Sequence, residues 1–88
     1  MTYNEFQAIK MGDKVAILCS LEEYGRLTKR DVVVAFEAPY AQFIESILNT
    51  VIEVHDKSQR SIQTWGGWQI YHQALTKITK EKNPEYFL

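Results

Sequence analysis

Two histidines and the acidic residues beside them are the side chains best suited to metal binding or acid–base chemistry. His55 and Asp56 are adjacent, Glu53 precedes them, and His72 follows later in the chain. If the fold brought these groups together, imidazole and carboxylate could hold a metal ion or transfer protons. Their spacing matches no local ligand motif, however, and is typical of histidines that are exposed or hydrogen-bonded. The sequence therefore predicts no catalytic residue, no metal site and no cofactor.

Nucleophilic and phosphate-binding motifs are also missing from the sequence. Cys19 is the single cysteine and ends the apolar run 15–19, which is typical of a buried, unreactive thiol. The glycine pair at 66–67 is flanked by tryptophans rather than by Lys and Ser or Thr, and Gly-x-Ser-x-Gly does not occur. Both a phosphate-binding loop and a nucleophile elbow are thereby excluded. We predict a protein that is not an enzyme.

The aromatic residues around the glycine pair are more informative. Trp65 and Trp68 flank the two glycines, and Tyr71 follows them. Large aromatic side chains beside flexible backbone are typical of protein interfaces, whereas the alternative is that both indoles fill the core. Together with Arg60 and Lys57, they could instead stack on single-stranded bases. The sequence favours a partner-binding role for this region and leaves these alternatives open.

Two further segments are candidate contact surfaces. Segment 21–30 is predicted to be an exposed loop, and its mixed charges would set partner specificity rather than affinity. The chain then ends in an apolar tip, which must either dock on the domain or mediate self-association. The residues of these two candidate surfaces are Glu22, Glu23, Arg26, Lys29 and Arg30 in the loop and Tyr86, Phe87 and Leu88 in the tip.

Length and charge exclude other classes of protein. The 88 residues allow one domain, residues 1–88, because domains mostly begin near 50 residues. Ten basic and eleven acidic residues give a net charge of −1, which argues against general DNA binding by phosphate neutralisation. No apolar stretch approaches the length of a membrane span, and the first residues are polar. We therefore predict no membrane segment, no signal peptide and a cytoplasmic location.

The first half of the chain alternates between helix and strand signals. Within residues 1–10, Thr2 and Glu5 have the spacing of a capping box, and Phe6 and Ile9 form an apolar edge, which predicts a helix over 2–10. The apolar run over 14–19 predicts a buried strand. A second strand is predicted over 31–37, where three consecutive valines favour a pleated sheet.

The second half is more ambiguous. Apolar residues at helical spacing predict a helix over 40–48, whereas β-branched residues predict a strand over 50–55. The polar segment 56–59 is predicted to be a hairpin loop that leads into a return strand over 60–65. Residues 68–79 fit a helix and a strand about equally, and residues 83–88 are predicted to form a tail.

Several short motifs resemble a known class of domain. The opening of the chain is similar to the first strand of small barrels of the Src-homology-three or KOW type, and its end is similar to their last strand. The motifs concerned are Phe6-x-x-Ile9 followed by Gly12-Asp13-Lys14-Val15, and Trp68-x-x-Tyr71-x-x-x-Leu75. The Gly-Asp-x-Val pattern, with Tyr24-Gly25-Arg26, also resembles small accessory proteins of bacteriophages.

This resemblance covers about a third of the chain and rests on structural motifs. It implies a binding module and carries over no catalytic residue. Two features depart from the pattern of such barrels, which puts a closed barrel in doubt: no glycine occurs between residues 26 and 65, and the helical stripe at 40–48 has no place in a minimal barrel.

Together, these observations predict an α+β domain with a small antiparallel sheet or a partly open barrel of four to five strands, covered by one or two short helices. A mostly β small barrel is the alternative fold. The predicted function is that of a protein-binding module, an accessory or inhibitory protein of phage or mobile-element type that occupies a surface of a larger host protein. A nucleic-acid-binding small barrel and a homo-oligomeric structural subunit are the alternatives.

Overall fold

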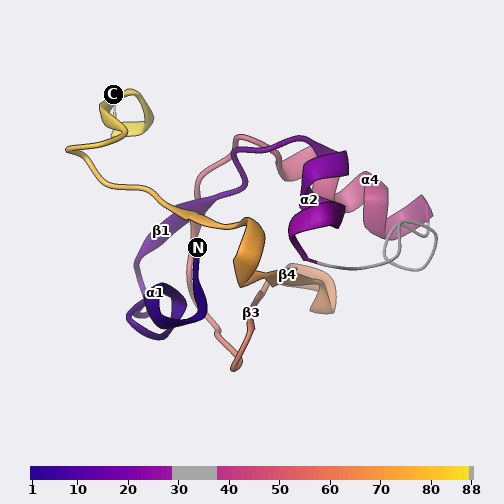
Figure 1. Cartoon of the computed structure of the whole chain (residues 1–88), viewed down its shortest axis with the longest axis horizontal. Coiled ribbons are helices and arrows are strands. Elements are labelled where there is room, and N and C mark those ends of the chain that lie inside the picture. The colour runs from indigo at the N-terminus through magenta and orange to yellow at the C-terminus, as the bar shows by residue number, and fades with distance from the viewer. Residues whose placement is uncertain (29–37, 88) are drawn as a thin grey trace.

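The computed structural model describes residues 1–28 and 38–87, with the backbone alone at Ala38 and Trp65. Helices and antiparallel strands are mixed along the chain, which confirms the predicted α+β class. Figure 1 shows helix α1 at one end of the molecule and helices α2 and α4 at the other. The strand predicted over 31–37, with Lys29 and Arg30 of the predicted loop, lies outside the described residues.

Three short strands form one antiparallel sheet. Strand β1 (Lys14–Ala16) lies between β2 (Ile52–Glu53) and β5 (Thr76–Lys77). Val15 pairs with Ile52 on one side and with Lys77 on the other, and its side chain is fully buried. The strand predicted over 14–19 is confirmed in place, but it is shorter than predicted, because Ser20 already caps a helix.

Two further strands form a hairpin. Strands β3 (Ser61–Gln63) and β4 (Gln69–Tyr71) are joined by the 3₁₀ turn η1 (Trp65–Gly67), and the buried Ile62 and Ile70 face each other across them. Within the described residues, the strands form no closed barrel. Segment 68–79, for which helix and strand were both open, therefore contains β4, the 3₁₀ turn η2 (His72–Ala74) and β5.

The hairpin predicted between segments 50–55 and 60–65 is wrong. Strand β2 pairs with β1 and β3 pairs with β4, because β1 supplies the apolar partner for Ile52. Residues 56–59 nevertheless reverse the chain as expected of a polar turn. Ser58 N–H donates to Ser61 O at 2.9 Å, and Lys57 bridges to Ile62.

Helix α1 (Tyr3–Gln7) is held at both ends by side chains. The predicted capping box is confirmed, since the Glu5 carboxylate accepts from Thr2 N–H at 2.8 Å and the Thr2 hydroxyl accepts from Glu5 N–H. At the other end, Lys57 Nζ donates to the carbonyls of Phe6 at 2.9 Å, Gln7 at 3.3 Å and Ile9 at 2.8 Å. Phe6 O also accepts from Ile9 N–H at 3.0 Å. Because the last carbonyls of a helix lack partners in a following turn, the ammonium group stabilises the point where α1 ends, before residue 10.

The loop predicted over 21–30 is wrong for its first part, which forms helix α2 (Leu21–Leu27). Ser20 is the N-cap, and its hydroxyl accepts from Glu23 N–H at 3.2 Å. The acidic Glu22 and Glu23 stand in the first turn, where the helix dipole favours negative charge. Tyr24, fully buried, then packs α2 against the core. The charged residues led to the prediction of a loop, although the segment is an amphipathic helix.

Helix α4 (Ala38–Ile47) confirms the helix predicted over 40–48. Ile44 and Ile47 are its buried face. Asn49 ends the segment in the left-handed region, with φ of 59°, and its N–H donates to Ile17 O at 2.9 Å. Asn tolerates this conformation better than most residues.

The core draws on helices α1, α2 and α4 and on strands β1, β2, β3 and β4, and the C-terminal segment lies outside it. The largest fully buried side chains are Phe6, Val15, Ile17, Tyr24, Ile44, Val54, Ile62, Ile70 and Leu75. In Figure 1, the 3₁₀ turn η3 (Pro84–Phe87) extends away from the sheet. Phe87 is 37% exposed, and Lys14 Nζ lies 4.9 Å above its ring. Leu88 lies outside the described residues.

Candidate functional site

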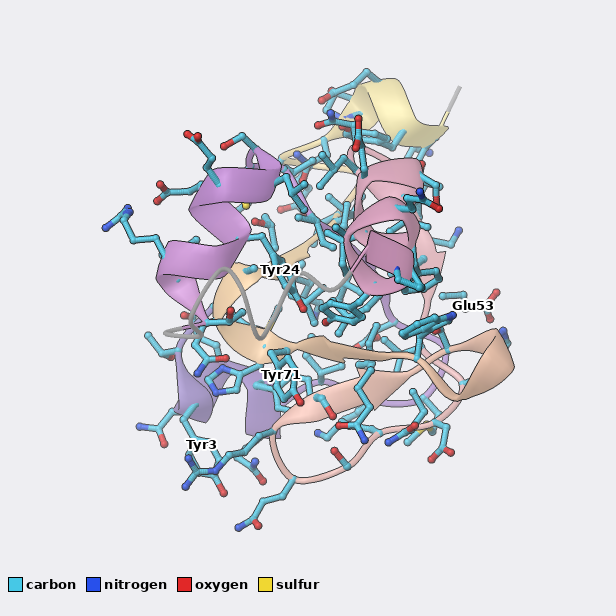
Figure 2. All side chains as sticks on the ribbon, turned by 90° about the vertical axis from the view of Figure 1, so that its right-hand side faces the viewer. Tyr3, Tyr24, Glu53 and Tyr71 are labelled. Atoms are coloured by element: carbon cyan, nitrogen blue, oxygen red, sulfur yellow. The ribbon has the colours of Figure 1, made fainter. Side chains whose placement is uncertain are left out.

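Two tyrosine hydroxyls cover the outer edge of strand β4. Tyr71 N–H donates to Tyr24 Oη at 3.2 Å, Tyr24 Oη lies 2.7 Å from Tyr40 Oη, and Tyr40 Oη donates to Gln69 O at 2.8 Å. Because the amide can only donate and the carbonyl can only accept, the hydroxyl of Tyr24 donates to that of Tyr40. Tyr24, which is fully buried, and the half-buried Tyr71 lie close together in Figure 2.

This hydrogen-bonded pair replaces a neighbouring strand. His72 N–H donates to the carbonyl of Arg60, the residue directly before β3. Since successive residues of a strand direct their backbone groups to opposite sides, Gln69 O and Tyr71 N–H point away from β3. An open strand edge is a template for pairing with another chain. The phenols of Tyr24 and Tyr40 thus bind these two edge groups and fix α2 and α4 against the hairpin.

Next to this pair, three half-buried rings form a cluster that we call the aromatic cluster: Tyr40, Phe43 and Trp68. The Phe43 and Trp68 rings are stacked, with centroids 5.4 Å apart and an interplanar angle of 15°. The Tyr40 ring lies 5.5 Å from Trp68 at 42°. Each ring buries one part against its neighbours and presents another part to solvent, as in the aromatic residues that dominate interfaces.

The hairpin turn fixes Trp68 within the cluster. Trp68 O accepts from Thr64 N–H at 2.8 Å and from the Thr64 hydroxyl at 2.9 Å. Between them, Gly66 and Gly67 have φ of 76° and 78°, the left-handed region that L side chains rarely adopt. The flexible joint expected between the two tryptophans is therefore a defined turn. Of Trp65, only the backbone is described.

The structure separates the other predicted partner-binding residues from Trp68. Arg60 and Tyr71 lie at the opposite end of the hairpin, about 10 Å away at 3.4 Å per residue. Arg60 stands 5.8 Å from the Tyr3 ring, and Lys57 caps α1. Arg60 and Lys57 consequently lie apart from Trp68.

The charged residues of α2 form a separate group. Glu23 and Arg26 make an exposed ion pair one turn apart, and Glu22 on the same helix is also exposed. Hydrogen bonding to Arg26 lowers the pKa of Glu23, and Glu23 in turn raises the pKa of Arg26. Since exposed pairs of this kind contribute little stability, the group is a solvated charged face.

The two histidines and the cysteine differ in their surroundings. His72 is buried, stacks on Phe6 at 5.3 Å and has Nδ1 3.1 Å from Met1 O, whereas His55 is exposed. Burial raises the pKa of the half-buried Cys19 thiol. In residues 1–28 and 38–87, no three His, Cys, Asp or Glu side chains gather where they could hold a metal ion.

The sequence prediction found Trp68 but missed its partners. Tyr40 and Phe43 belong to the predicted helical stripe and were not predicted to bind a partner. The available signal was the phenol of Tyr40, because a buried hydroxyl requires a hydrogen-bond partner. Tyr24 was placed in a loop, where no such requirement applies.

No protein family, curated protein or solved structure matches this chain. The resemblance to small barrels and to phage accessory proteins therefore stays a prediction. None of the described helices has the length and hydropathy that a bilayer-spanning segment requires.

Proposed function

We propose that this protein is a non-enzymatic protein-binding module and that the aromatic cluster is its contact surface. The observation that carries this proposal is the stack of half-buried rings in which Trp68 lies against Phe43 and Tyr40. Rings held in place by their neighbours lose little conformational entropy on binding, so they contribute large contact area at low cost.

The geometry favours a protein partner over a single-stranded nucleic acid. A base needs an open aromatic face on which to stack, whereas Phe43 already stacks on Trp68. Lys57 and Arg60, the basic residues expected to act together with these aromatics, lie elsewhere, Lys57 at the end of α1 and Arg60 beside the Tyr3 ring. An accessory or inhibitory role of phage or mobile-element type remains part of the proposal, and it rests on the sequence resemblance alone.

Partner capture followed by quantitative binding tests the proposal. The partner captured from bacterial lysate would be purified and its affinity measured by calorimetry for the wild type and for Phe43→Ala and Trp68→Ala. Loss of a central aromatic residue weakens interfaces by 2 kcal/mol or more, so we expect each variant to bind about 30-fold less tightly or worse.

Tyr3→Ala is the matched control, because Tyr3 is an aromatic residue 39% exposed at the α1 end of the molecule. It should leave affinity unchanged. Thermal melting of each variant separates lost contact from lost folding. Equal affinities for all variants, or capture of oligonucleotides with a steep salt dependence, would contradict the proposal.

A further inference from the structure

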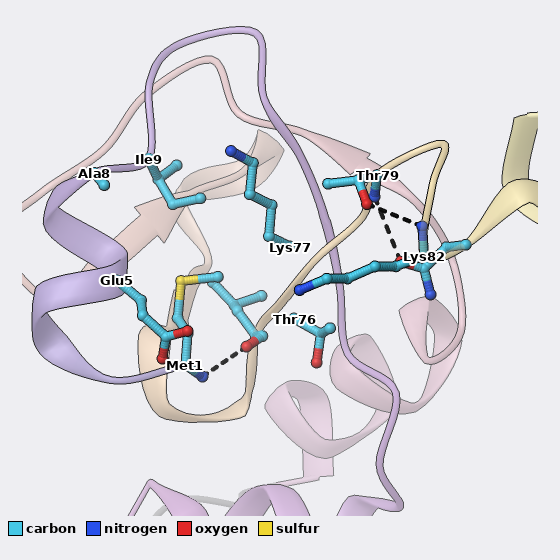
Figure 3. A pocket seen from close by; sticks show the side chains of 10 residues that line it. Met1, Glu5, Ala8, Ile9, Thr76, Lys77, Thr79 and Lys82 are labelled. Carbon is cyan, nitrogen blue, oxygen red and sulfur yellow. Dashed lines mark hydrogen bonds between the residues drawn. The ribbon is translucent and has the colours of Figure 1, made fainter.

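A hollow lies at the α1 end of the molecule, away from the aromatic cluster, between α1 and the segment that follows η2. Its volume is about 510 Å³, within the roughly 300–1,000 Å³ of small-molecule sites. Its apolar side is formed by Met1, Ala8, Ile9 and Leu75, of which Ile9 and Leu75 are almost fully buried. Met1 is held there by its amino group, which donates to Leu75 O at 2.7 Å (Figure 3). We call this hollow the lysine pocket.

Charged side chains line the rest of the lysine pocket. Figure 3 shows Lys82 extending across the hollow toward the side of Glu5, whereas the ammonium group of Lys77 points toward Ile9. Lys77 Nζ lies 3.9 Å from Asp13 Oδ2, which is a weak and half-exposed pair. The pocket is therefore lined by two lysines, the Met1 ammonium group and the single carboxylate of Glu5, while Asp13 lies outside the lining.

Hydrogen bonds fix the turn that carries Lys82. Asn83 N–H donates to Thr79 O at 2.7 Å, and Lys82 N–H donates to the Thr79 hydroxyl at 3.2 Å. The Asn83 side-chain oxygen in turn accepts from Thr79 N–H at 3.4 Å. The backbone of Lys82 is thus held at the pocket mouth, so its ammonium can reach the hollow.

We propose that the lysine pocket binds a small organic anion, a carboxylate or phosphate monoester with a short hydrocarbon body. The apolar body would lie on Met1 and on the exposed Ala8, and the anionic group would lie between Lys77 and Lys82. Glu5 repels an anion less than the two lysines attract it, because its carboxylate is already engaged by Thr2 N–H. This site is distinct from the aromatic cluster, so it goes beyond the proposed function and does not depend on it.

Titration with octanoate tests the proposal, with octanol as the uncharged probe of equal chain length. Amide shifts in ¹H–¹⁵N spectra report the site. We expect saturable shifts at Ala8, Ile9 and Lys77 with a midpoint in the low-millimolar range, as about −0.3 kcal/mol per heavy atom gives for a probe of this size, and a midpoint for octanol at least threefold higher. Absence of saturable shifts at these amides, or equal binding of octanol, overturns the proposal.

Charge variants identify the groups that bind the anion. Lys77→Gln and Lys82→Gln should each weaken octanoate binding about threefold to tenfold, as expected for one unit charge at a half-exposed site. Glu5→Gln should strengthen it, because glutamine keeps the capping bond and removes the repelling charge. Lys80→Gln is the matched control, since Lys80 belongs to the same turn but does not line the pocket. If Lys80→Gln weakens binding as much as Lys82→Gln, the pocket is not the site.

Discussion

The two ends of the molecule satisfy their polar groups in opposite ways. At the α2 and α4 end, Tyr24 and Tyr40 bind the edge of β4 and each other, and the aromatic cluster lies beside them. At the α1 end, Lys77, Lys82 and Glu5 line a hollow. The aromatic cluster offers apolar area, as the proposed protein partner requires. The lysine pocket offers positive charge beside apolar side chains, as the proposed small anion requires.

The largest expected effect is the loss of the buried hydroxyl at the first end. Tyr24→Phe leaves Tyr71 N–H without its acceptor and removes the donor to Tyr40. An unsatisfied buried group costs about 1–3 kcal/mol, so Tm should fall by roughly 4–8 °C for each kcal/mol lost. Chemical denaturation monitored by circular dichroism measures this loss.

The matched variant at the second end is Lys82→Gln, which should change the free energy of unfolding by less than about 0.5 kcal/mol, as surface substitutions usually do. If Lys82→Gln destabilises the protein as much as Tyr24→Phe, then Lys82 is part of the structural framework, and the contrast between the two ends is lost.

The hairpin turn gives the next largest effect. Gly67 has φ of 78° and no atom within 4 Å of an added Cβ, so Gly67→Ala tests backbone conformation alone. We expect it to lower the free energy of unfolding by about 1–2 kcal/mol. Gly67→Asn should cost less, because asparagine tolerates the left-handed region. Equal stability of all three proteins would show that the turn changes conformation freely and does not fix Trp68.

Local signals in the sequence predicted individual helices and strands better than they predicted which strands pair. The capping box of Thr2 and Glu5, the stripe over 40–48 and the alternation before the glycine pair each act within a few residues, and each prediction was confirmed. The pairing of β2 with β1 joins residues almost 40 positions apart, which no local pattern specifies. Helix α2 was missed because its charged face dominates a segment with only a few apolar residues.

The same limit explains what was missed at the two candidate sites. Trp68 stood out by its type and by the glycines before it, whereas the role of Tyr24 depends on a hydrogen bond to residue 71, and that of Lys57 depends on carbonyls 48 to 51 positions earlier. The lysine pocket joins α1 to residues 75–83. No pattern in the sequence groups its side chains, because only the fold brings the two segments together.

The smallest expected effect is the pH dependence contributed by Glu5. Its pKa is lowered, first by the hydrogen bond from Thr2 N–H and only to a minor extent by the charge of Lys82. A lowered pKa in the folded state means that the ionised form stabilises the protein. This contribution is present above the ordinary pKa near 4.5 and is lost as the pH falls through the folded value.

Thermal melting between pH 3 and pH 7 tests this assignment and the separation of capping from the pocket. Glu5→Gln keeps the capping bond but cannot titrate, so the decrease in Tm toward low pH should be smaller than in the wild type. Lys82→Gln should retain almost the whole decrease, because the main cause lies in α1 itself. If Lys82→Gln removes as much of the decrease as Glu5→Gln does, Glu5 and Lys82 form a strong ion pair across the hollow. An incoming anion would then have to break that pair, and the lysine pocket would be closed by its own charges.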